Sequence, residues 1–218
     1  MGHPVPGADG DRLARLLSEE RRLAARIGGL APAARAALAA AVAGRLLPHY
    51  LRFHEQTGQG EPAVLETALD GVWNLLRHGT PFDVVTVGVA CLDQAQVAVD
   101  HGRALAGTVA FDAWKVVNGA ATPRTENAVY AASAVARACH VAVHGQVREA
   151  LHSLRDGRGS ALALALSRQG GVTGAQSVRV AEREPLVRRE VDRQLLDLGI
   201  LEASGPTAAV LTKLRARG

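Results

Sequence analysis

The sequence predicts an all-α protein, a single-domain helical bundle of roughly seven to nine helices. The first observation is composition, since 48% of the 218 residues are hydrophobic but only 3% are aromatic. A core of this composition relies on alanine and aliphatic side chains, which favours helices because strands are enriched in aromatic and β-branched residues. The second observation is spacing: apolar residues recur at helical intervals between glycine and proline separators.

These separators divide the chain into expected segments. Residues 1–9 are expected to form a flexible N-terminal tail, 10–204 the helical domain, and 205–218 an Arg-rich C-terminal tail. Within the domain, helices are predicted at 11–27, 33–47 continuing across Pro48 to Gly58, 62–78, 93–106, 109–118, 125–155 with a break at Gly145, 160–168 and 184–201.

One segment, Val84 to Leu92, is apolar and rich in valine, as a strand would be. A lone strand would have no pairing partner, so we expect a buried helix there. The rest of 80–122 is expected to be helical only over 93–106 and 109–118. Glycines farther along the chain are interpreted as separators between helices, namely Gly157, Gly159, Gly170, Gly171 and Gly174.

The basic character of the chain is weak evidence for nucleic-acid binding. The sequence pI is about 9.7, but the formal net charge is only +4, and the only lysines are Lys115 and Lys213. Arginine in place of lysine raises the calculated pI without adding charge at neutral pH. We therefore interpret the basicity as compositional.

Cysteine usage and hydropathy favour a cytoplasmic protein. Cys91 and Cys139 each lie in an apolar run, where free cysteine behaves as a small hydrophobe. The first residues lack the charged and apolar regions of a secretory signal, and no apolar stretch is long enough for a membrane span. The expected location is the cytoplasm, without membrane attachment.

The strongest local pattern surrounds Pro48. Leu46, Tyr50 and Phe53 follow i, i+4, i+7 spacing and so share one helix face. Because this phase is kept across Pro48, we expect a kinked helix rather than a new one. Tyr50, Phe53 and Trp73 are predicted to be largely buried.

A polar face runs alongside this apolar stripe. Its residues also keep helical spacing: Arg45, His49, Arg52 and Gln56. One interpretation is a structural corner with a solvated polar side. The alternative is a binding face that gathers an anion or a partner's carboxylate.

This region resembles the YjaG-like family of uncharacterised bacterial proteins, the domain of unknown function 416. The resemblance rests on Arg45-Leu-Leu-Pro48-His-Tyr50-Leu-Arg-Phe53, Gln56-Thr-Gly58 and Leu69-Asp70-Gly-Val-Trp73. It implies an all-helical bundle in the cytoplasm and no known reaction. It marks as structural the residues Arg45, Pro48, Tyr50, Phe53, Gly58, Asp70, Trp73, Tyr130, Pro185 and Glu190.

The resemblance is weaker over 123–200. Val129-Tyr130-Ala-Ala resembles the family's Tyr-Pro-Ala helix start, and Glu184-Pro185-Leu-Val resembles its last helix. Ala131 and Ala134 stand where the family has a proline and an aspartate. The absence of that carboxylate argues against any acid/base role that the family position would imply.

The histidines between 140 and 152 are a candidate metal site. His140 and His144 at i, i+4, with Glu149 and His152 as a Glu-x-x-His, have metal-ligand spacing. A di-metal bundle needs a second such motif, and the sequence has none. Alternatively these side chains are scattered surface or packing residues, so we predict no metal and no cofactor.

Residues 172–203 could form a helix-turn-helix that presents arginines to phosphate. The arginines are Arg179, Arg183, Arg188 and Arg189. Glutamate and aspartate alternate with them, which weakens phosphate attraction. Nucleic-acid binding is the less favoured interpretation.

The sequence contains no nucleophile elbow, Walker-type loop or dinucleotide fingerprint, so no catalytic residue is predicted. The favoured hypothesis is a non-enzymatic interaction or accessory protein that uses helix faces for a partner or a homodimer. The alternatives are a metal-binding or enzymatic bundle using histidines at 139–152, and nucleic-acid binding through 172–203.

Overall fold

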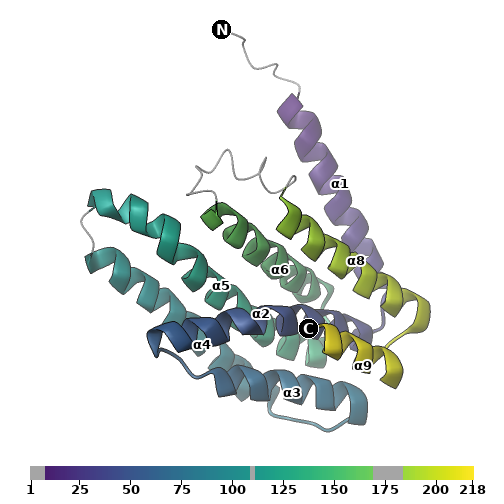
Figure 1. The fold of residues 1–218 in the computed structure, drawn as a ribbon. Coiled ribbons are helices and arrows are strands. Elements are labelled where there is room, and N and C mark those ends of the chain that lie inside the picture. The colour runs from purple at the N-terminus through teal and green to yellow at the C-terminus, as the bar shows by residue number, and fades with distance from the viewer. Residues whose placement is uncertain (1–7, 109–110, 169–183) are drawn as a thin grey trace.

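The computed structural model describes residues 8–108, 111–168 and 184–218, and it describes the side chains of 18–104, 125–165 and 184–218. The described residues form eight helices and no strand, which confirms the predicted all-α bundle (Figure 1). The helices are α1 Ala8–Gly29, α2 Pro32–Thr57, α3 Pro62–His78, α4 Val84–Thr108, α5 Phe111–His144, α6 Val147–Arg168, α8 Pro185–Ser204 and α9 Ala208–Arg217.

The core forms around α2 and α5. Every residue from Ala36 to Ala43 on α2 is buried, and α5 contributes buried alanines such as Ala131 and Ala138. Small side chains let the two helix backbones approach closely, so this pair packs extensively. The other sides of α5 pack on α4 and α6. The low aromatic content is therefore sufficient for a closely packed core.

The corner between α5 and α6 contains the predicted break at Gly145. Its φ of 59° is left-handed backbone, which glycine adopts without strain, and its N–H donates to the Val141 carbonyl at 2.8 Å. The Arg35 guanidinium donates to the Gly145 carbonyl at 2.7 Å and to the Ile27 carbonyl at 3.0 Å. One arginine on α2 thus holds the ends of α1 and α5 together.

The expected helices at 93–106, 109–118, 125–155 and 160–168 differ from the observed boundaries. The chain forms α4, α5 and α6 instead, each longer than expected. Gly157 and Gly159 lie inside α6 rather than between helices. A Cβ at Gly159 would overlap the Tyr130 ring, so this glycine gives α5 room to pack.

Val84 to Leu92 forms the first part of α4, so a helix is confirmed there. The expected burial is wrong, however: Cys91 is the only buried residue of this segment, and Val85, Val89 and Leu92 are 74%, 54% and 53% exposed. The reason is that α3 and α5 cover only one side of α4.

Residues 205–218, predicted to be an Arg-rich C-terminal tail, contain α9. Thr207 caps this helix through its side chain, which accepts from the Val210 N–H at 3.4 Å. Leu211 and Leu214 are buried at 1% and 0% exposure. The arginine-rich composition hid these two core positions, which anchor α9 against α2 and α3.

Candidate functional site

Arg45 on α2 is bound by two acidic side chains of α8. It donates to Asp197 Oδ2 at 2.7 Å and to Glu190 Oε1 at 3.2 Å. The side chains are almost completely buried, with 6%, 2% and 10% exposure for Arg45, Asp197 and Glu190. Arg217 of α9 also approaches Asp197, at 3.5 Å. The cluster joins α2, α8 and α9, and its charges largely compensate one another.

Gln194 extends this buried cluster toward α6. Its Nε2 donates to Glu190 Oε1 at 2.9 Å and to the Leu154 carbonyl at 3.0 Å, and its Oε1 accepts from Arg158 Nε at 2.9 Å. A Cβ at Gly157 would lie 2.8 Å from Gln194 and from Glu190. Glycine at 157 is therefore what admits α8 and its polar side chains to α6.

The residues of the predicted polar face do not form one surface, because the Arg45 side chain is buried and others are exposed. Arg45 turns inward to the carboxylates of its own chain, while Arg52 is exposed and its Nε donates to the Pro48 carbonyl at 3.3 Å. Gln56 is also exposed. Burial, and then the charge of Arg52, lower the pKa of His49. Arg45 therefore binds carboxylates of its own chain, on α8, rather than the partner's carboxylate that the sequence suggested.

The aromatic residues of the Pro48 region lie inside the bundle. Tyr50, Phe53 and Trp73 are 0%, 2% and 2% exposed, as predicted. The α2 helix is continuous across Pro48. The Tyr50 hydroxyl donates to Gln94 Oε1 at 2.8 Å, and burial raises the pKa of Tyr50 to about 12. Tyr50 is thus a satisfied core residue that fixes α2 to α4.

The other residues marked by the resemblance have structural positions. Gly58 ends α2 with a φ of 67°, and Pro185 occupies the first turn of α8. Asp70 accepts from Arg215 at 2.6 Å. Tyr130 packs on Gly159.

The histidine region brings only two of its potential ligands into contact. The rings of His140 and His144 lie 4.5 Å apart at 47°. Glu149 accepts instead from Arg137 at 3.0 Å, and His152 lies 3.4 Å from Arg155. Within the described residues, no three His, Cys, Asp or Glu side chains gather as a metal site would require.

Arg137 joins two acidic groups of α6. Besides Glu149 it donates to Asp156 Oδ2 at 2.8 Å. Burial raises the pKa of Asp156, against the opposing influence of Arg137. This pairing was not predicted from the sequence, because the partners lie on different helices.

Part of the predicted helix-turn-helix, 172–183 with Arg179 and Arg183, lies outside the described residues. Arg188 and Arg189 are exposed on α8, as is Asp192. The described part of this region therefore presents charges of both signs.

An apolar ridge, defined as Val85, Val89 and Leu92, runs along the outer side of α4. The i, i+4, i+7 spacing places the three side chains on one helix face. All three are more than half exposed. The sequence contained this spacing, but it could not show which side of α4 the core would cover.

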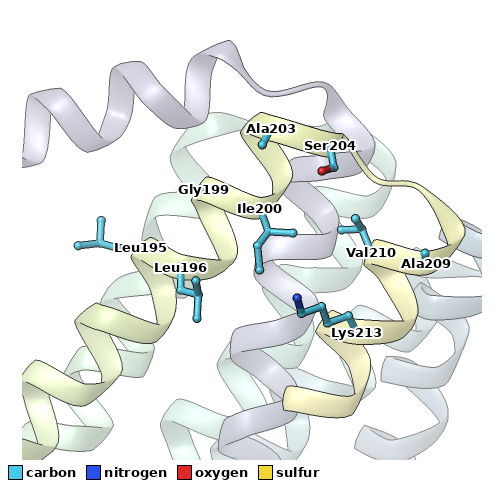
Figure 2. Close-up of a pocket in the computed structure, with 9 residues that line it drawn as sticks. All are labelled: Leu195, Leu196, Gly199, Ile200, Ala203, Ser204, Ala209, Val210 and Lys213. Atoms are coloured by element: carbon cyan, nitrogen blue, oxygen red, sulfur yellow. The ribbon is translucent and has the colours of Figure 1, made fainter.

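An apolar groove lies between α8 and α9 (Figure 2). It has a volume of about 470 Å³. Ile200 and Val210 face it from opposite sides, and the Lys213 side chain extends from α9 toward α8. Its lining consists of Leu195, Leu196, Gly199, Ile200, Ala203, Ser204, Ala209, Val210 and Lys213.

The helices and their buried ion pairs define the class of protein: an α-helical bundle with apolar surface left uncovered on α4 and between α8 and α9. No helix in the described ranges combines the length and hydropathy that a membrane span requires. No curated protein matches the chain.

Residues 22–85 match the model of the family described as "Protein of unknown function (DUF416)". The fold is similar to the crystal structure of a DUF416 family protein from Shewanella baltica OS155, with a TM-score of 0.68 and 20% sequence identity. That likeness covers 88% of this chain and 91% of the Shewanella chain. These two findings confirm the resemblance to this family that the sequence showed.

Proposed function

We propose that this protein is a non-enzymatic interaction protein and that its partner is a second copy of the same chain, bound through the apolar ridge of α4. The observation that carries the proposal is the exposure of Val85, Val89 and Leu92 on one helix face. Covering such a face removes apolar area from water, which drives association.

The inner side of α4 supplies the buried contacts of this helix with the bundle. Cys91 and Ala98 are fully buried on that side, facing the bundle. The helix thus has apolar residues on two opposite faces, and its own chain uses one. The other is available to a partner.

The small size of the ridge sets the expected strength. Three side chains and their surroundings form an interface well below the roughly 1,200 Å² of stable complexes. We therefore expect weak association that depends on concentration. The cytoplasmic location expected from the sequence stays a prediction.

Sedimentation velocity over a concentration series tests this proposal. The wild-type protein should show a weight-average mass that rises with concentration, and Val89→Lys should remain monomeric. Asn74→Lys, at an exposed position of α3, is the matched control and should associate like the wild type. Wild-type protein that stays monomeric up to about 500 µM would contradict the proposal.

A further inference from the structure

Acidic residues border the ridge on both sides. Asp83 precedes α4, where its Oδ1 accepts from the Thr86 N–H at 3.1 Å, and Asp93 directly follows Leu92. Both are exposed. The partner surface that fits this ridge is therefore apolar with a positive charge at its border.

Symmetric pairing of two ridges does not supply that charge. If two α4 helices pack antiparallel across Val89, Asp83 of each copy comes near Asp93 of the other. If they pack in parallel, the two Asp93 side chains meet. Like charges placed opposite each other weaken an interface.

The groove between α8 and α9 has the complementary properties. Its lining is mainly aliphatic, and Lys213 of α9 extends an ammonium group across it toward α8 (Figure 2). Lys213 forms no ion pair within the part of the chain that the structure describes, whereas Arg215 and Arg217 on the same helix bind Asp70 and Asp197. Lys213 is thus available for an acidic partner group.

The groove also has room for a side chain. Gly199 lies in its lining, and a Cβ built there meets no atom within 4 Å. Leu195 and Leu196 beside it are 39% and 53% exposed. The groove therefore leaves apolar surface uncovered around an open position on α8.

We propose that the α4 ridge of one copy inserts into the α8–α9 groove of the next copy, with Asp93 of the first paired to Lys213 of the second. This inference rests on the proposed function and adds the receiving surface. The two surfaces differ, so the contact is heterologous: in a pair, the first copy keeps a free groove and the second keeps a free ridge. Association therefore continues beyond the dimer unless a ring closes.

Two blocked variants distinguish this contact from a symmetric one. Val89→Lys removes the ridge and keeps the groove, while Gly199→Phe fills the groove and keeps the ridge. In a heterologous contact each variant alone remains monomeric, because each lacks one surface. An equimolar mixture forms a dimer and nothing larger, because only one complementary contact is left. Gly199→Ala leaves most of the groove open and is the matched control, which should associate like the wild type.

Charge exchange gives a second measurement by the same sedimentation method. Asp93→Lys and Lys213→Glu should each weaken association by about fivefold or more, as expected when an attractive pair becomes repulsive. The double variant, Asp93→Lys with Lys213→Glu, should recover most of that loss. Thermal melting of every variant checks that the bundle remains folded.

The outcomes separate the two proposals. Association that Val89→Lys abolishes but that Gly199→Phe and Lys213→Glu leave unchanged would overturn the groove contact and keep the ridge as a symmetric interface. Absence of wild-type association would overturn both.

Discussion

The Nη1 atom of Arg45 lies 2.7 Å from Asp197 Oδ2, although 152 residues separate the two in the chain. Asp197 also lies 3.5 Å from Arg217 of α9. Because Asp197 is only 2% exposed, its carboxylate depends on these partners rather than on water. This pair connects the part of the chain with the strongest family motif to the C-terminal helices.

Replacement of Arg45 by methionine should destabilise the protein by about 3–5 kcal/mol, because it leaves Asp197 and Glu190 buried without their main partner. Arg52→Met is the control, since Arg52 is exposed, and it should change stability by less than about 0.5 kcal/mol. Urea unfolding of both variants measures the difference. Equal stability of the two would show that the buried ion pairs are not needed for the bundle.

Alanine at Gly60 should be far more destabilising than alanine at Gly58. Both glycines have left-handed backbone, with φ of 76° and 67°, so both substitutions cost about 1–2 kcal/mol. A Cβ at Gly60 would additionally overlap the Tyr50 hydroxyl, whereas nothing lies within 4 Å at Gly58.

The overlap at Gly60 can be isolated by a double-mutant cycle. In a Tyr50→Phe background the hydroxyl is absent, and Gly60→Ala should cost less than it does in the wild type. Thermal or urea unfolding of the four proteins gives the coupling. A cost that is the same in both backgrounds would contradict the close approach of Tyr50 and Gly60.

Removal of the Leu214 side chain tests whether α9 belongs to the core. Leu214→Ala should cost about 2–5 kcal/mol, as for other fully buried leucines. Leu196→Ala is the matched control, since Leu196 is 53% exposed and should contribute much less. Chemical denaturation checks both. A Leu214 variant as stable as the control would contradict the packing of α9 in the core.

His49 should make stability depend on pH. Its pKa in the folded protein lies below the ordinary value of 6.5, because burial and the charge of Arg52 disfavour the imidazolium. The unfolded chain therefore takes up the proton first as the pH falls, and stability decreases as the pH falls through about 6.5 toward the folded-state pKa.

His49→Gln removes this contribution. The stability of the wild type relative to the variant should decrease when the pH is lowered from about 7.5, where histidine is largely neutral, to about 5.5. Urea midpoints at the two pH values measure it. A constant difference between wild type and variant would show that the two states of the chain bind protons equally at His49.

Much of the fold is predictable because its signals are local. The break at Gly145 follows from glycine's access to positive φ, and the buried positions of Tyr50 and Phe53 follow from i, i+3 spacing on one side of α2. These features depend on the residue and its neighbours in the chain. Helix boundaries beyond residue 92 were less well predicted, because glycines such as Gly157 serve packing rather than termination.

The candidate surfaces depend on which helix covers which. Val85, Val89 and Leu92 have the same spacing as a core stripe, and only the positions of α3 and α5 leave them outside. Lys213 and Leu196 line the same groove because the chain turns after Ser204 and places α9 beside α8.

By itself, the sequence determined that this chain folds as an α-helical bundle with small side chains in its core. Helix propensity and apolar spacing are local properties, which depend only on each residue and its neighbours in the chain. Only the tertiary structure decided that Arg45 is neutralised by α8, that α9 belongs to the core and that the outer side of α4 is uncovered. The physical reason is that burial and ion pairing are properties of contacts between distant segments, and packing selects these from many combinations of similar helices.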